Sequence, residues 1–167
     1  EVKLFVQNGV VDFATVDMGK AILDPEQIPV KIRGLQFNNV LNYPVTIEEK
    51  EYSITCVSMG NPHAVVFWNN LDNLDIEYSP LFPERVNVEF VQIINTTTLK
   101  MRVWERGSGE TWSCGTGACA AAVAAVLNGY CNKDKQITVK LKGGDLLIKY
   151  TDESVYLSGK AEKVYEG

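Results

Sequence analysis

The residue of this chain best suited to chemistry is a cysteine at the expected start of a helix. Cys114 lies in the sequence Trp-Ser-Cys-Gly-Thr-Gly at residues 112–117, directly before an alanine-rich segment. The first N–H groups of a helix lack partners within it, and the helix dipole places positive charge at the same end. Both effects favour a thiolate, and the same N–H groups bind carboxylates or phosphates. The pattern favours a reactive thiol over the alternative of an ordinary buried cysteine.

A Glu-Arg pair followed by two glycines precedes this cysteine. Arg106 carries the planar guanidinium that binds a carboxylate through two hydrogen bonds, and Glu105 can orient a thiol or exchange a proton with it. Gly107 and Gly109 allow the backbone to approach a ligand closely. The alternative is a surface ion pair, which contributes little to stability. The neighbouring cysteine favours the functional interpretation.

Two turns supply further polar side chains. Gly-Asn-Pro-His at residues 60–63 predicts a tight turn between strands, which contains Asn61 and the single histidine of the chain, His63. The sequence Pro-Glu-Arg-Val-Asn at residues 83–87 leads into another strand at Asn87. Taken alone, each of these turns is more often structural than catalytic.

An alanine-rich helix must position the cysteine. We predict this helix from Cys114 or Gly115 to about Asn128, with Gly129 as its C-terminal cap. Residues 120–127 have no polar face, so the helix must be enclosed by other elements. A weak apolar period predicts a second, shorter helix or turn near Leu71–Leu81.

The remaining elements read as strands separated by turn signals. The Gly143-Gly144 pair predicts a hairpin. The predicted strands lie near residues 2–6, 11–17, 52–59, 64–68, 87–95, 98–104, 137–141, 145–150 and 154–158. The predicted fold class is α+β, a curved, mostly antiparallel sheet or barrel wrapped around the central alanine-rich helix.

Composition narrows the function classes. The 167 residues are 46% hydrophobic and 22% charged, which predicts a folded core. A net charge of −5 argues against nucleic acid and against an anionic membrane as partner, and no apolar run reaches the roughly 20 residues of a membrane span. The four cysteines form no C-x-x-C pair and one histidine lies apart from them, so neither a metal site nor a redox pair is expected. Free thiols without a secretory signal favour the cytoplasm.

The motifs together resemble those of the diaminopimelate epimerases. The similar segments are the Gly-Asn-Pro-His turn, the Pro-Glu-Arg-x-Asn entry, the Glu-Arg-Gly-x-Gly-Glu-Thr loop at residues 105–111 and the Cys-Gly-Thr-Gly helix start, in the same order. The resemblance runs the length of the chain. It implies an isomerase that inverts an α-carbon without any cofactor, using one cysteine as thiolate base and another as thiol acid.

The resemblance also implies roles for individual residues. It makes Cys114 one of the two thiols, with Glu105 assisting it and His63 as a further proton-handling group that serves this thiol or the opposite one. The residues expected to bind diaminopimelate are Asn61, Asn87, Glu105, Arg106, Gly115 and Thr116.

The chain departs from the family in one respect. The family's first half carries the other cysteine at a Cys-Gly-Asn-Gly helix start, and no such segment occurs here. We therefore interpret residues 20–154 as the second half, and residues 1–19 and 155–167 as strands that belong with the first. The chain alone is expected to be inactive, and its partners are expected to be diaminopimelate, the first half and, as in much of the family, a second copy. The alternatives are a proline racemase-like or phenazine-biosynthesis-like isomerase of the same fold, or a non-catalytic domain.

Overall fold

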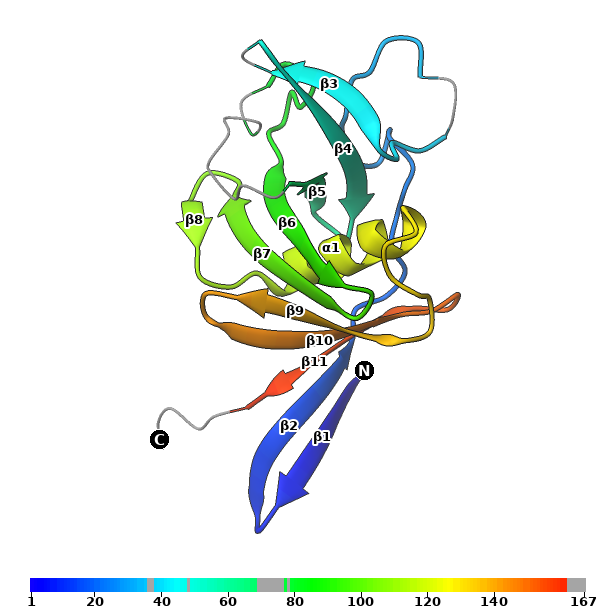
Figure 1. Ribbon diagram of the computed structural model, residues 1–167. Helices are drawn as coiled ribbons and strands as arrows, with labels where there is room; N and C mark the ends of the chain where they lie inside the picture. The colour runs from blue at the N-terminus through cyan, green and yellow to red at the C-terminus, as the bar shows by residue number, and fades with distance from the viewer. Residues whose placement is uncertain (36–37, 48, 69–76, 78, 162–167) are drawn as a thin grey trace.

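A computed structural model describes residues 1–35, 38–47, 49–68, 77 and 79–161 (Figure 1). The described chain forms one helix and an 11-stranded sheet. The strands are β1 (Val2–Gln7), β2 (Val10–Asp17), β3 (Tyr43–Ile47), β4 (Lys50–Ser58), β5 (Pro62–Phe67), β6 (Asn87–Asn95), β7 (Thr98–Glu105), β8 (Gly109–Thr111), β9 (Gln136–Leu141), β10 (Gly144–Tyr150) and β11 (Val155–Lys160), and the helix is α1 (Gly115–Leu127).

The helix begins and ends as the sequence predicts. Cys114 is its N-cap, with extended backbone angles, and Asn128 is its C-cap. Gly129 follows with a φ of +79°, a conformation that glycine adopts without steric cost. The N–H of Gly129 donates to the carbonyl of Val126, and the N–H of Tyr130 donates to that of Ala125. This pair of bonds is a Schellman motif, which satisfies carbonyls that the helix itself leaves unpaired.

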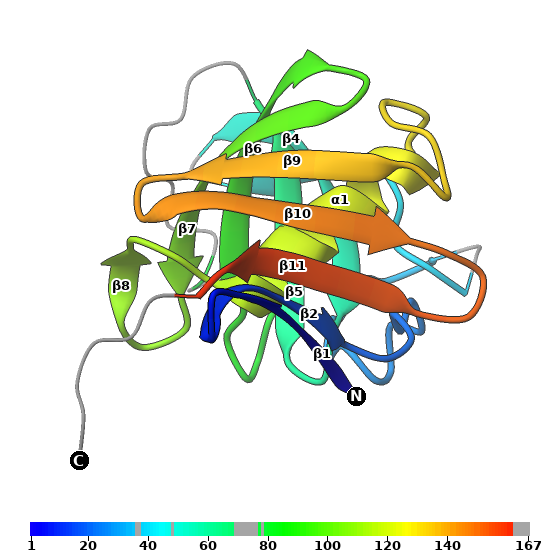
Figure 2. The same ribbon diagram turned by 90° about the horizontal axis from the view of Figure 1, so that it is seen from below.

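The sheet curves around this helix. Its strand order is β1-β2-β11-β10-β9-β7-β6-β5-β4-β3, with β8 paired to β7. Strands from both ends of the order contact α1, among them β10, β11, β4 and β5, and Figure 2 shows β9, β10 and β11 crossing the helix. All residues from Gly117 to Ala125 are buried. The α+β prediction is therefore confirmed, with an open, mixed sheet in which β5–β6 and β7–β9 are parallel.

Strands β4, β5 and β6 bury both of their faces over much of their length. Successive side chains of a strand point to opposite sides of a sheet. In β6, Val91 packs in the cluster that contains the helix, whereas Val88 and Phe90 pack in a second cluster with Ile28 and Phe82. The odd-numbered residues of β6 therefore face α1. A polar residue with an odd number in this strand lies on the side of the sheet that the helix covers.

The nine predicted strands are confirmed with shifts of one or two residues at their ends, and so is the Gly143-Gly144 hairpin. Two short strands were not predicted. β3 contains Pro44, which weakens a strand signal and is tolerated because β3 is at the edge of the sheet. β8 has three residues and continues a glycine loop. Most of the predicted helix or turn at Leu71–Leu81 lies outside the described residues.

The β1–β2 hairpin projects from the rest of the molecule (Figure 1). Five of its apolar side chains are between 54% and 58% exposed, namely Val2, Leu4, Phe5, Val6 and Val10. β2 pairs with β11, and β11 pairs with β10, so the hairpin extends the sheet.

Within the described residues, no helix has the length and apolar character needed to cross a membrane.

Candidate active site

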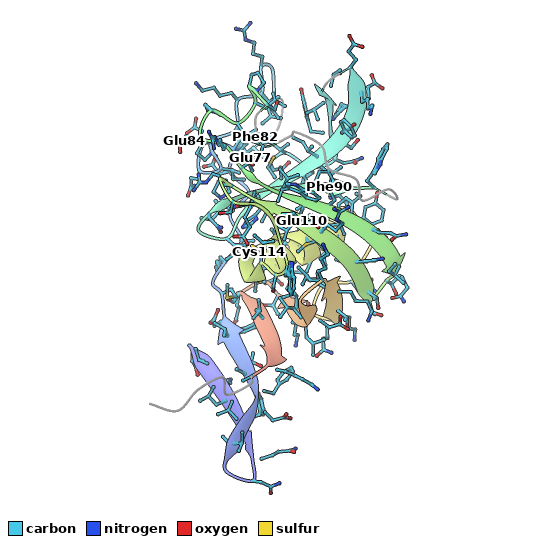
Figure 3. The ribbon with its side chains drawn as sticks, turned by 90° about the vertical axis from the view of Figure 1, so that its left-hand side faces the viewer. Glu77, Phe82, Glu84, Phe90, Glu110 and Cys114 are labelled. Atoms are coloured by element: carbon cyan, nitrogen blue, oxygen red, sulfur yellow. The ribbon has the colours of Figure 1, made fainter. Side chains whose placement is uncertain are left out.

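The fold places Cys114 at the exposed end of an otherwise enclosed helix. The Cys114 Sγ accepts a hydrogen bond from the N–H of Gly117 at 3.3 Å and lies 3.5 Å from the Thr116 Oγ1. The side chain thus caps the helix in the way that serine or aspartate does elsewhere. Figure 3 shows Cys114 where the larger part of the molecule meets the hairpin. The thiol therefore touches the positive end of the helix, as the sequence predicts.

The surroundings of this thiol act on its pKa in both directions. Burial raises the pKa of the Cys114 thiol above its ordinary value, and the carboxylates of Glu89 and Glu105 raise it further. The hydrogen bonds from Thr116 and from the Gly117 N–H act in the opposite direction. Cys114 is only 9% exposed, so desolvation of the charged form outweighs the helix end.

A hydrogen-bonded chain leads from this thiol into the core. The Asn61 Nδ2 donates to the Thr116 Oγ1 at 3.3 Å, and the Asn61 Oδ1 lies 3.0 Å from the His63 Nε2. The other ring nitrogen of His63, Nδ1, lies 2.7 Å from the Glu89 Oε1. His63 and Glu89 are both fully buried. The structure therefore connects His63 with Cys114 through two polar side chains.

Glu89 is a site residue that the sequence analysis missed. It lies at an odd position of β6 and so faces α1, where only apolar side chains are expected. A Cβ added to Gly117 would lie 2.7 Å from the Glu89 Oε1, so the glycine makes room for the carboxylate. The available signal was a single charged residue inside the otherwise uncharged strand at residues 87–95. Buried carboxylates are rare without a partner, which makes such a residue informative.

We predict that Gly117→Ala destabilises the fold although alanine is the better helix former. The added methyl group displaces a carboxylate that cannot move into water, and such overpacking costs about 1–3 kcal/mol. The free energy of unfolding in urea measures the effect. Gly115→Ala is the matched control, because its nearest neighbour is the mobile end of Leu157 at 3.2 Å. Equal stabilities of the two variants would contradict the prediction.

The Glu105-Arg106 loop is held by buried polar groups. The Arg106 N–H donates to the Asn87 Oδ1 at 2.8 Å, and the Asn87 Nδ2 donates to the Pro62 carbonyl at 2.9 Å. Asn87 thus joins the Asn-Pro turn to this loop. The Glu105 Oε1 accepts a bond from Thr111 at 2.6 Å, and the exposed Arg106 side chain reaches the Glu84 carbonyl at 3.2 Å.

A second residue was missed in this loop. Glu77, which is 5% exposed, accepts a bond from the Gly107 N–H at 2.8 Å. Its sequence neighbourhood carries no signal that points to this contact. The structure thus gathers predicted residues around two points. Asn61, His63, Thr116 and Cys114 form one chain of contacts, and Asn87 of β6 is hydrogen-bonded to the loop that follows Glu105.

The other three cysteines are also buried. Burial raises the pKa of Cys119 to about 12, and Cys119 packs in the core on the helix. Cys56 lies in β4 and is fully buried, and Cys131 follows the helix and is 5% exposed. All four cysteines are free thiols. The described residues hold no cluster of three or more His, Cys, Asp or Glu side chains that fits a metal ion.

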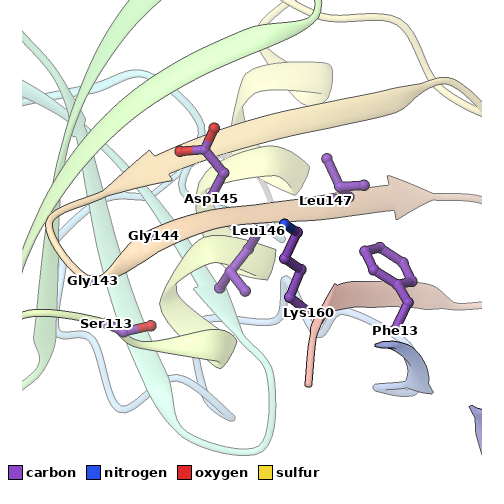
Figure 4. A pocket seen from close by; sticks show the side chains of 8 residues that line it. All are labelled: Phe13, Ser113, Gly143, Gly144, Asp145, Leu146, Leu147 and Lys160. Atoms are coloured by element: carbon purple, nitrogen blue, oxygen red, sulfur yellow. The ribbon is translucent and has the colours of Figure 1, made fainter. Parts of the chain in front are cut away.

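A pocket of about 600 Å³ lies beside the helix start (Figure 4). It is lined by Phe13, Ser113, Gly143, Gly144, Asp145, Leu146, Leu147 and Lys160. None of these is a predicted site residue, although Ser113 is adjacent to Cys114. The pocket lies between the tip of the β9–β10 hairpin and the strands β2 and β11, which is the side of the molecule that carries the exposed apolar side chains.

Known structures share this fold at low sequence identity. A probable proline racemase from Agrobacterium radiobacter with bound carbonate aligns with 99% of this chain and 57% of its own at a TM-score of 0.68 and 10% identity. A hydroxyproline epimerase from Agrobacterium vitis with bound trans-4-OH-L-proline aligns with 95% of this chain and with 53% of its own chain. The TM-score of this alignment is 0.66 and the sequence identity is 14%. These likenesses establish the fold.

Sequence comparison identifies the family. The family profile described as Diaminopimelate epimerase matches residues 55–164. Proteins named diaminopimelate epimerase from Acetivibrio thermocellus and Desulfovibrio desulfuricans are 51% and 49% identical over 99% of this chain. The chain spans 60% and 61% of the length of these two relatives. On the extent of the profile match and the identity to both relatives, the chain belongs to the diaminopimelate epimerase family.

Proposed function

We propose that this chain is the C-terminal half of a cofactor-independent, two-cysteine epimerase that interconverts LL- and meso-2,6-diaminopimelate. The observation that carries the proposal is the geometry of Cys114, whose sulfur caps an enclosed helix and is hydrogen-bonded to the Gly117 N–H and close to the Thr116 hydroxyl. A group that gives a proton to a carbanion must be protonated and must lie where negative charge is stabilised. The position of the Cys114 sulfur at the helix N-terminus supports this role.

The neighbouring groups are suited to the substrate. The N–H groups of Gly115 and Thr116 belong to the first turn of α1, where the helix offers no partner, and they would bind the α-carboxylate. Arg106 is exposed at the rim and would bind a carboxylate at the distal end of the substrate with Asn61 and Asn87. Glu105, whose charge acts on Cys114, would assist the thiol, and His63 would handle a proton.

The half that carries the second thiol would supply the opposite face of the substrate. We propose that residues 20–154 form the second half, and that residues 1–19 and 155–167 complete the sheet of the first half. The exposed apolar side chains of β1 and β2 and the pocket beside Ser113 support this division, since both would be covered by an added domain. Its partners would be diaminopimelate, the first half and a second copy, in the bacterial cytoplasm, where the product serves lysine and peptidoglycan synthesis.

Exchange of the substrate α-proton tests the proposal. The chain is incubated with meso-diaminopimelate in deuterated water, alone and together with the first half, and deuterium at the α-carbon is measured by mass spectrometry. We expect no exchange by the chain alone, because one thiol cannot serve both faces, and exchange once the first half is present. Exchange of proline but not of diaminopimelate by the assembled halves would favour the proline racemase-like alternative. No exchange of either substrate would favour a non-catalytic domain.

A further inference from the structure

The buried pair of Glu89 and His63 is connected to the thiol by bonds whose direction can be assigned. The Asn61 Nδ2 donates to the Thr116 Oγ1, so the Asn61 Oδ1 is the atom that faces the His63 Nε2. Because an amide oxygen only accepts, the His63 Nε2 must carry a proton. The Thr116 hydroxyl accepts from Asn61 and is therefore free to donate its own proton to the Cys114 Sγ, 3.5 Å away.

The opposite side of the histidine ring faces a carboxylate. The His63 Nδ1 lies 2.7 Å from the Glu89 Oε1, a distance typical of a charge-assisted bond. Within the described residues, the Glu89 Oε2 is buried without a hydrogen-bond partner, so His63 is the group that compensates this carboxylate. An ionised carboxylate without access to water requires a countercharge, and a doubly protonated His63 would supply it through Nδ1.

The charge of Glu89 by itself opposes a thiolate. Glu89 raises the pKa of two thiols, that of Cys114 at the helix start and that of Cys56, which packs on the other side of the sheet. A cation hydrogen-bonded to Glu89 offsets this effect. His63 is the partner of Glu89 and begins the hydrogen-bonded chain that ends at Cys114.

We propose that Glu89 is a positioning residue that holds His63 doubly protonated, so that Asn61 and Thr116 carry hydrogen-bond donation from the imidazolium to the Cys114 sulfur. The proposal rests on the proposed function for the role of Cys114, whereas the charge of His63 is measurable without substrate. It involves no proton transfer: the imidazolium keeps both protons, and each bond in the chain donates toward the sulfur.

Nitrogen NMR of the single histidine tests the charge state directly. In the ¹⁵N-labelled chain at about pH 7.5, where a free imidazole is mostly neutral, we expect both ring nitrogens of His63 to give protonated signals. In Glu89→Gln we expect the ratio of protonated to neutral ring to fall at least about tenfold. Glu51→Gln, which neutralises an exposed carboxylate, is the matched control and is expected to leave the spectrum unchanged.

A neutral ring in the unsubstituted chain would overturn the proposal, whichever nitrogen carries the proton. With the proton on Nε2, a protonated Glu89 would donate to Nδ1. With the proton on Nδ1, Asn61 would turn its amide toward the ring, and Thr116 would donate to Asn61 instead of the sulfur. A spectrum of Glu89→Gln identical to that of the unsubstituted chain would also overturn it. Neither outcome depends on epimerase activity, so a failure here is distinct from a failure of the proposed function.

The alkylation rate of Cys114 tests the connection to the thiol. His63→Gln removes the cation and leaves the Glu89 charge, so we expect iodoacetamide to modify Cys114 about tenfold more slowly at about pH 8. Adding Glu89→Gln to this variant should restore part of the rate, because both charges are then absent. Peptide mass mapping separates Cys114 from the other three cysteines. Rates within twofold of the unsubstituted chain for His63→Gln would contradict the proposed connection.

Discussion

Replacing Cys114 with serine is expected to lower the exchange of the substrate α-proton by about 10²–10⁴-fold, which is the usual contribution of a positioned acid or base. A serine hydroxyl holds its proton far more tightly than a thiol does. The substitution should leave the fold intact, because serine is a favoured N-cap and its oxygen can accept the bond from the Gly117 N–H. The measurement is deuterium incorporation into diaminopimelate by the chain combined with the first half.

Cys131→Ser is the matched control for this experiment. Cys131 is also a free, nearly buried thiol, but it follows the opposite end of the helix. We expect this variant to keep the exchange rate of the unsubstituted protein. Retention of more than about a tenth of that rate by Cys114→Ser would show that Cys114 does not transfer the proton.

Replacing Phe90 with alanine is expected to have the largest effect on stability, about 3–5 kcal/mol. Phe90, labelled in Figure 3, is the largest fully buried side chain of the described residues. Its ring packs edge-on against Trp104 at a centroid distance of 5.3 Å. Truncation leaves a cavity between β6 and the loops that cover its outer face. The change in the free energy of unfolding, measured in urea, gives the magnitude.

Phe5→Ala provides the control for the loss of an aromatic ring. Phe5 is 54% exposed in the β1–β2 hairpin and meets Phe13 at a centroid distance of 6.3 Å. Its truncation should cost about 1 kcal/mol or less, because it removes one ring contact and creates no cavity. A loss at Phe90 no larger than at Phe5 would mean that the outer cluster is not tightly packed.

The elements of the fold were largely predictable from local pattern. Short local patterns predict these elements, namely the uniformly apolar run in α1, the glycine that caps it and the alternation of residues in the strands. The exceptions have local causes, since Pro44 obscures β3 and β8 is too short to show a period. The strand order could not be predicted from local pattern. It depends on contacts such as the parallel pairing of β7 with β9, whose partners are about 40 residues apart in the sequence.

The residues of the candidate site also differ in how far the sequence predicts them. Cys114, Asn61, His63 and Arg106 carry side chains with evident chemistry, and motif resemblance placed them in one site. Glu89 gave only a weak signal, since a charged residue in a strand usually faces solvent. Its importance follows from the inward face of β6 and from the absence of a side chain on Gly117.

The helix, nine of the strands, the place of Cys114 at the helix start and the family could be predicted from the sequence, because these depend on the order of neighbouring residues and on motifs. The burial of the Cys114 sulfur and the hydrogen-bonded path from Glu89 to it became visible in the folded chain alone. Desolvation and charge pairing depend on which groups surround an atom in space. The helix N-terminus favours a thiolate, but burial of the same sulfur outweighs it, and that balance exists only once the sheet has closed around the helix.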